Sequence, residues 1–127
     1  MREIHIQSAL ARARGLGSAK SGSRHWWLQR VSALALAPLS VWFVISFAAL
    51  LSADHRSYSE WIGSPLNAVL MILLVIVLFY HMSLGLQVVA EDYLHTDWTK
   101  LFAIIAIQFG SLVLAIASIV SILRMLT

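Results

Sequence analysis

The chain has 127 residues, of which 60% are hydrophobic and 12% are charged, and its mean hydropathy is +0.82. Soluble domains have roughly 45–50% apolar and about 25% charged residues, so these charges are too few to cover a soluble globule. The same composition excludes disorder, and the absence of cysteine excludes disulfide scaffolds, cysteine-ligated zinc, iron–sulfur clusters and thiol nucleophiles. One small membrane domain remains.

A basic arm comes first in the chain. Residues 1–24 hold five Lys or Arg residues, a single acid, Glu3, and three glycines among many small side chains. This segment lacks the apolar stretch of a secretory signal. We therefore expect an N-terminal arm over residues 1–24, ahead of a membrane domain over residues 25–127.

Three long runs without Asp, Glu, Lys or Arg follow, over residues 31–51, 67–90 and 101–123. As helices they would be roughly 31–36 Å long, which matches a hydrocarbon core of about 30 Å. Only helices and closed barrels satisfy their backbone polar groups in lipid, and barrels need short alternating strands rather than continuous apolar runs. The sequence therefore predicts an all-α protein with three transmembrane helices.

The basic residues predict the orientation in the membrane. Six of the nine Lys and Arg residues precede the first run, and the rest are spread singly over the two loops and the tail. The positive-inside rule then places the N-terminus in the cytoplasm, loop 52–66 outside, loop 91–100 inside and the C-terminus in the periplasm. A net charge of +3, gathered mainly on one arm, gives no indication of a nucleic-acid partner.

His81 is the only side chain within the three runs that changes its charge near neutral pH. Ionisable groups inside a membrane are functional by default, and neutral imidazole is a good ligand for haem iron. Gly85 follows one turn later and removes bulk where a flat macrocycle needs room, while Ser83 and Gln87 add modest polarity. The alternatives are a proton carrier or a hydrogen-bonded packing histidine at position 81, and close helix packing at Gly85.

One histidine cannot complete a six-coordinate haem. The candidates His25, His55 and His95 lie outside the runs, away from the depth of His81. A haem at this position would therefore need a ligand from a partner subunit or a second copy of the chain.

An acidic and aromatic pair, Asp92 and Tyr93, follows the second run. Asp92 comes 11 residues after His81, so both lie on nearly the same helical face if the helix continues. A tyrosine hydroxyl beside a carboxylate at the membrane border can bind a quinone carbonyl and relay protons. Alternatively, Tyr93 only anchors the helix at this border.

Taken together, these residues resemble a known family. The spacing of His81, Gly85, Asp92 and Tyr93, with the segment 22–33 that leads into the first run, is similar to the hydrophobic membrane-anchor subunit of succinate dehydrogenase, respiratory complex II. The resemblance covers roughly residues 20–127. It implies three helices that pack with a partner's helices into a larger bundle.

The resemblance also implies roles for individual residues. His81 matches an axial ligand of haem b, the other ligand coming from the cytochrome b subunit, and Tyr93 and Asp92 match residues of the ubiquinone site. Arg30 matches a basic residue that we place near the haem propionates, where a guanidinium can pair with carboxylates; ending the span at the membrane surface is the alternative. The flavoprotein and iron–sulfur subunits would carry the remaining redox groups.

The resulting hypothesis is an anchor subunit that is not catalytic alone and that couples the tricarboxylic acid cycle to electron transport in the respiratory chain. The short N-terminal arm favours a bacterial inner membrane over the mitochondrial inner membrane. The anchor of a quinol:fumarate reductase is a near alternative. A non-redox structural or transport membrane protein is a second, but the first and third runs offer only serines and one glutamine as polar residues besides tryptophan.

Overall fold

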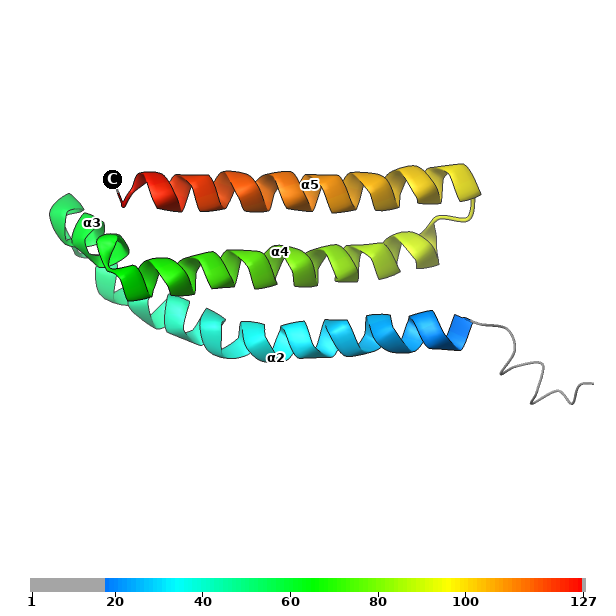
Figure 1. The fold of residues 1–127 in the computed structure, drawn as a ribbon, viewed down its shortest axis with the longest axis horizontal. Helices are drawn as coiled ribbons and strands as arrows, with labels where there is room; N and C mark the ends of the chain where they lie inside the picture. Colours follow the sequence, from blue (N-terminus) through cyan, green and yellow to red (C-terminus); the bar gives the residue numbers. More distant parts are fainter. Residues whose placement is uncertain (1–17, 127) are drawn as a thin grey trace, which may run out of the picture.

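The computed structural model describes the backbone of residues 18–126 and the side chains from residue 22 onward. Within that range the chain forms four helices and no strand: α2 (Ser18–Leu50), α3 (His55–Gly63), α4 (Pro65–Tyr93) and α5 (Asp97–Arg124). Figure 1 shows the three long helices lying side by side, with α4 between α2 and α5. The all-α fold predicted from the sequence is confirmed.

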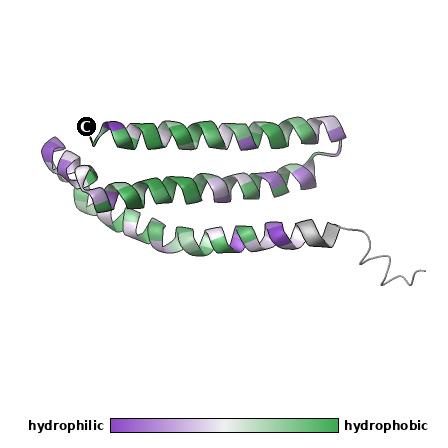
Figure 2. Cartoon of the chain, viewed as in Figure 1, coloured by the Kyte–Doolittle hydropathy of each residue, from purple (hydrophilic) through white to green (hydrophobic). Residues whose placement is uncertain are grey.

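The three long helices have the length and composition of membrane spans. The apolar segments Gly22–Leu50, Pro65–Tyr93 and Asp97–Arg124 hold 28 or 29 residues each, which corresponds to about 42–44 Å of helix. This exceeds a hydrocarbon core of about 30 Å, so the helix ends extend into the interfacial regions. Figure 2 shows hydrophobic residues along the middle of α4 and α5 and hydrophilic ones toward the ends of the helices.

The helices begin and end beyond the uncharged runs. α2 begins at Ser18, within the segment expected to be an arm, so Arg24 and Arg30 lie on its first turns; residues 1–17 of that arm lie outside the described residues. α4 continues through Asp92 to Tyr93. Water at the interface solvates charged side chains and backbone groups, so a helix can extend beyond the apolar run that crosses the lipid.

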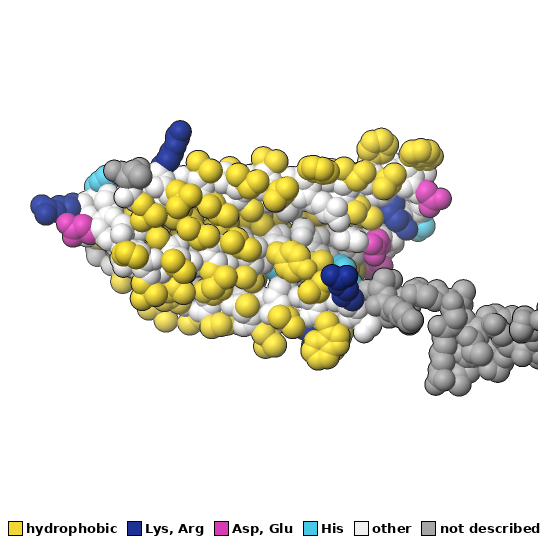
Figure 3. All heavy atoms as spheres, viewed as in Figure 1, with side chains coloured by type: hydrophobic (Ala, Val, Ile, Leu, Met, Phe, Trp, Pro, Cys, Tyr) yellow, Lys and Arg dark blue, Asp and Glu magenta, His cyan; other side chains and the backbone are white. Residues whose placement is uncertain are grey.

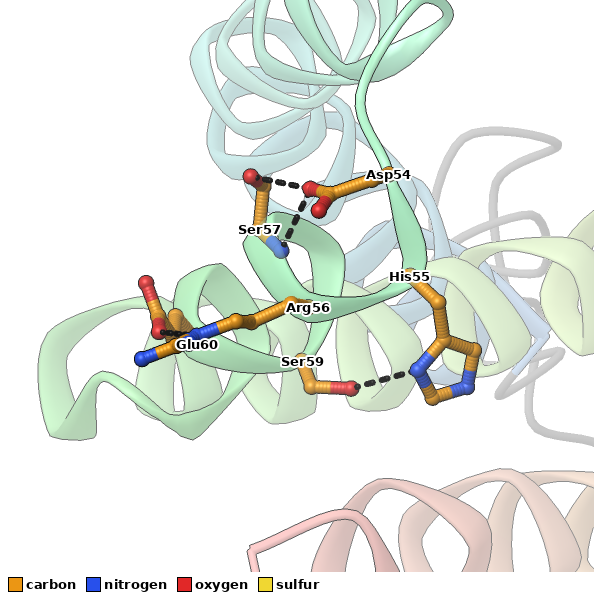
Figure 4. Close-up of polar contacts among 6 residues, drawn as sticks. All are labelled: Asp54, His55, Arg56, Ser57, Ser59 and Glu60. Carbon is orange, nitrogen blue, oxygen red and sulfur yellow. Dashed lines mark hydrogen bonds and ion pairs between the residues drawn. The ribbon is translucent and has the colours of Figure 1, made fainter.

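The expectation of a loop over residues 52–66 was wrong in part, because helix α3 occupies most of it. Asp54 caps α3 by accepting hydrogen bonds from the backbone N–H of Ser57 (3.0 Å) and from its hydroxyl, as Figure 4 shows. Nε of Arg56 donates to Oε1 of Glu60 at 2.9 Å, one turn along. The hydrogen bonds from Ser57 hold the pKa of Asp54 below its ordinary value of 3.8.

Trp61 of α3 contacts both α2 and α4. Its ring stacks on Trp42 of α2, with centroids 5.8 Å apart and planes 21° apart. Nδ2 of Asn67, in the first turn of α4, donates to the carbonyl oxygen of Trp61 at 2.8 Å. Ile62, the next residue, is only 2% exposed. These contacts close the end of the structure opposite the N-terminus of α2 (Figure 1).

Pro38 lies inside α2, where its ring removes one backbone hydrogen bond from the helix. Figure 1 shows that α2 curves toward α3 over its second half. Proline is a common cause of such bending.

Few side chains are buried by the chain itself. Among the described residues no side chain is fully buried, and the buried hydrophobic ones are Leu39, Ile62, Ala68, Leu74, Leu84, Ala90 and Ile122. Figure 3 shows apolar side chains covering the visible face of the three helices, with charged ones gathered mainly near the two ends. Most of the apolar surface is therefore left for lipid or for the helices of other proteins.

Candidate functional site

His81 lies at the interface between α4 and α2. Its Nδ1 is 2.9 Å from Oγ of Ser32, and its Nε2 is 3.4 Å from Nε2 of Gln29. Ser32 is only 7% exposed. The histidine of the second span is thus held by two polar side chains of the neighbouring helix.

The first turns of α2 present a stripe of polar residues to α4. His25, Gln29 and Ser32 are spaced by four and then three residues, so they share one face of the helix. Gln29 and Ser32 were not predicted as neighbours of His81. Their helical spacing places them on one face of α2, but it does not say that this face meets His81.

A hollow lined in part by polar side chains lies beside this stripe. It has a volume of about 540 Å³ and is lined by Gly22, His25, Trp26 and Gln29 of α2 and by Gln87, Val88 and Glu91 of α4. Two buried atoms of its lining residues, Nε2 of His25 and Oε1 of Gln29, have no hydrogen-bond partner among the described residues. Unpaired buried polar atoms are costly, so a small movement of these side chains would let a polar group of a ligand or partner satisfy them.

Gly85 faces the same stripe. A Cβ at this position would meet Nε2 of Gln29 at 3.5 Å, which is ordinary van der Waals contact. The space that Gly85 leaves is therefore occupied by the Gln29 carboxamide, and a macrocycle could use it only if that side chain turned away. The expectation that Gly85 gives clearance to haem stays a prediction.

Ser83 does not belong to the surroundings of His81. It is two residues further along α4 and therefore on nearly the opposite side of the helix, and it lines a cavity of about 500 Å³ between α4 and α5. Its hydroxyl donates to the carbonyl oxygen of Tyr80 at 2.8 Å. Gln87 lines this cavity as well as the hollow beside α2.

Asp92 and Tyr93 lie at the last turn of α4, at the same end of the structure as the start of α2 (Figure 1). Both are exposed, Tyr93 to 77%. Because α4 is continuous from His81 to Tyr93, the two positions are about 18 Å apart along the helix axis. The expectation that His81 and Asp92 lie on one continuous helix is therefore confirmed.

Arg30 lies next to Gln29 in sequence but points elsewhere. Its side chain is exposed, and its Cζ lies 4.5 Å from the centroid of the Trp26 ring. Successive residues of a helix are about 100° apart around its axis, so Arg30 is not on the polar stripe. Its pairing with haem propionates stays a prediction.

The donor set around His81 fits half of a haem site. Over residues 22–126, no three His, Cys, Asp or Glu side chains lie close enough together to hold a metal ion. The imidazole offers one ligand nitrogen, Nε2, whose neighbour is a single distant amide, while Nδ1 is engaged by Ser32. This arrangement would let His81 give one ligand to a haem iron, and a second would have to come from outside the described residues.

Comparison with known proteins identifies the family. Residues 5–116 match the family described as Succinate dehydrogenase/Fumarate reductase transmembrane subunit. This chain belongs to that family. The matched region contains Arg30, His81, Asp92 and Tyr93, and the resemblance seen in the sequence is confirmed.

Curated relatives extend along most of the chain. A succinate dehydrogenase hydrophobic membrane anchor subunit of Rickettsia bellii is 34% identical over 92% of this chain and 94% of its own length. A protein of the same name from Paracoccus denitrificans is 34% identical over 83% of this chain and 81% of its own. The succinate dehydrogenase membrane anchor subunit of Reclinomonas americana is 29% identical over 70% and 77%. No solved structure matches the chain.

Proposed function

We propose that this chain is a membrane-anchor subunit of a succinate dehydrogenase, and that it gives one axial ligand to haem b and part of a ubiquinone-reduction site. The observation that carries the proposal is the position of His81, held between two spans by Ser32 and Gln29. The names of the relatives support the anchor role. The haem and quinone roles are inferred from the residues.

His81 is the haem ligand in this proposal. Its Nε2 is free to bind iron once the distant amide of Gln29 turns aside, because Nδ1 already has a partner in Ser32. When bound, haem b supplies a one-electron redox centre within the bilayer. The cytochrome b subunit would supply the opposite ligand, so that one cofactor would join the two chains and stabilise their complex.

Tyr93 and Asp92 form this chain's part of the quinone site. Quinone reduction takes two electrons and two protons, and the protons come from water, so the site must lie where lipid meets water. The exposed end of α4 meets that requirement. The Tyr93 hydroxyl can donate a hydrogen bond to a quinone carbonyl, and Asp92 can pass protons from the aqueous side.

The chain cannot supply the electrons itself. It has no cysteine for iron–sulfur clusters, so the iron–sulfur and flavoprotein subunits would oxidise succinate and deliver electrons to the quinone. The basic first turns of α2 lie at the same end as Asp92 and Tyr93 (Figure 1). By the positive-inside rule this end faces the cytoplasm of a bacterium, where the tricarboxylic acid cycle operates.

The family also includes transmembrane subunits of fumarate reductases. The relatives described above are named for succinate dehydrogenase, which favours the succinate-oxidising enzyme. The same side chains would serve the reverse reaction.

Purification from native membranes tests the proposal. The chain, carrying an affinity tag, is isolated in mild detergent, and its partners and optical spectrum are recorded. We expect a flavoprotein, an iron–sulfur protein, a second membrane subunit and a reducible haem b to be isolated with it. A chain that purifies without redox partners would overturn the proposal.

Substitution of His81 tests the haem role separately. His81→Leu should abolish or shift the haem b spectrum of the assembled complex, whereas His95→Leu, in the exposed connection between α4 and α5, should leave it unchanged. An unaltered spectrum in the His81 variant would refute the ligand assignment while leaving the anchor role intact.

A further inference from the structure

We infer that Ser32 is a positioning residue that fixes the tautomer of His81, with the proton on Nδ1 and the lone pair on Nε2. The inference rests on the proposed ligation of haem by His81, and it names the group that prepares the ligand nitrogen. Two independent contacts lead to the same tautomer.

The first contact is the hydroxyl of Ser32. It donates its hydrogen to the carbonyl oxygen of Gln29, one turn back in α2, at 3.0 Å. A serine hydroxyl has one hydrogen and two lone pairs. With the hydrogen already used, Oγ can only accept at its 2.9 Å contact with Nδ1 of His81. The proton in this contact therefore belongs to Nδ1.

The second contact is the side-chain amide of Gln29. Its nitrogen is a donor and has no lone pair to offer, and it lies 3.4 Å from Nε2 of His81. In this orientation of the amide, Nε2 is the acceptor, which is the unprotonated nitrogen of the same tautomer. The length of this contact makes it a weak one, and it leaves Nε2 available to a stronger partner.

Because Ser32 is buried, its contact with Nδ1 determines the tautomer of His81. Ser32 is 7% exposed, so water has little access to satisfy Nδ1 in its place. Metal-ligating histidines generally donate their other N–H to an oxygen, which fixes the ring and raises the basicity of the ligand nitrogen. A hydroxyl oxygen is a weaker acceptor than a carboxylate, so Ser32 orients the ring without placing a charge beside it.

The tautomer is tested first without haem. The full chain, labelled with ¹⁵N-histidine, is placed in lipid bilayers, and the His81 signals are assigned by their loss in His81→Leu. We expect a protonated Nδ1 and an unprotonated Nε2 in the wild type, and a mixture of tautomers in Ser32→Ala. A protonated Nε2 in the wild type would overturn the inference whatever the role of haem.

The effect on the cofactor is tested in the assembled complex. Ser32→Ala should keep haem b but move its midpoint potential to a more positive value and change its electron paramagnetic resonance g values, because a less basic ligand favours ferrous iron. Ser32→Thr keeps the hydroxyl and should restore the wild-type values. Ser40→Ala removes a hydroxyl from α2 about 12 Å further along the axis and serves as the control.

The outcomes separate the two proposals. A wild-type potential and spectrum in Ser32→Ala, or equal changes in Ser32→Ala and Ser32→Thr, would overturn the role of Ser32. Loss of haem in Ser32→Ala with recovery in Ser32→Thr would support it. Retention of the normal haem spectrum in His81→Leu would instead refute the proposed ligation.

Discussion

The guanidinium of Arg30 lies over the indole ring of Trp26, one turn back in α2, with Cζ 4.5 Å from the ring centroid. Both side chains are exposed, and a cation–π contact at an exposed site contributes about 0.5–1 kcal/mol. The contact aligns the arginine along the border of the first span. It is weak enough to give way to an anionic group such as a carboxylate, with which a guanidinium forms stronger paired hydrogen bonds.

Replacing Arg30 tests its expected place near the haem propionates. Arg30→Gln should shift the haem b midpoint potential to a more negative value, because removing a nearby positive charge makes reduction less favourable. A redox titration of the assembled complex measures the shift. Arg24→Gln removes an equal charge from the same helix and should have little effect; equal shifts in the two variants would contradict the placement.

The hydroxyl of Tyr93 is expected to act on the quinone. Tyr93→Phe should lower succinate:ubiquinone turnover roughly 3- to 10-fold, the loss expected for one hydrogen bond of about 0.7–1.4 kcal/mol. Succinate oxidation by a soluble artificial acceptor should stay at the wild-type rate. Tyr58→Phe, on α3 at the opposite end of the structure, is the matched control. Equal loss of both activities would indicate a defect in assembly instead.

Gly85 distinguishes clearance for a cofactor from ordinary helix packing. Gly85→Leu would place a large side chain against Gln29, whose Nε2 already lies 3.5 Å from the Cβ position. We expect a lower haem content per complex, measured from the reduced optical spectrum. Gly110→Leu is the control, because its Cβ would meet no atom within 4 Å among the described residues. Full haem content in the Gly85 variant would exclude the clearance role.

The membrane orientation is testable with single cysteines, since the chain has none of its own. In intact cells, a maleimide that cannot cross the inner membrane should label Ser59→Cys on α3. It should label Thr96→Cys, between α4 and α5, only after the membrane is permeabilised. Both positions are exposed. The reverse pattern would overturn the cytoplasmic placement of the N-terminus.

The cap of α3 predicts a local pH effect. Because the pKa of Asp54 is lowered, its carboxylate stabilises α3 at pH values above 3.8, and this contribution is lost as the pH falls through the lowered value. Ser57→Ala removes the largest cause, so the pKa of Asp54 should rise toward 3.8. Carbon-13 NMR of the carboxyl group measures it. Ser59→Ala, whose lost hydroxyl contacts His55 rather than Asp54 (Figure 4), should leave it unchanged.

The three spans were predictable because the lipid core requires about 20 consecutive residues to be apolar. Nothing comparable marks α3, whose nine residues are largely polar and whose stability depends on the Asp54 cap and the Trp42–Trp61 contact. A stacking partner 19 residues away in the sequence is set by how α3 is placed against α2. Sequence patterns within one helix do not contain that information.

In the candidate site too, features within one helix were predictable from the sequence and contacts between helices were not. His81 stood out because an imidazole is rare in an apolar run, and its position on one helix with Asp92 followed from spacing alone. Its partners Ser32 and Gln29 come from a different helix, so identifying them requires the rotation of α2 about its axis. Polar residues such as serine are tolerated throughout membrane spans, and Ser32 differs from the others only in what it faces.

The scarcity of buried side chains has a consequence for the amount of this protein in a cell. With so little of the helix surface covered by the chain itself, the contacts among α2, α4 and α5 provide limited stability, and partner subunits would provide much of the rest. A copy made in excess of its partners would open more often and be degraded sooner. Its steady-state level should therefore follow the supply of the other subunits, which makes turnover of surplus copies a means of keeping the complex stoichiometric.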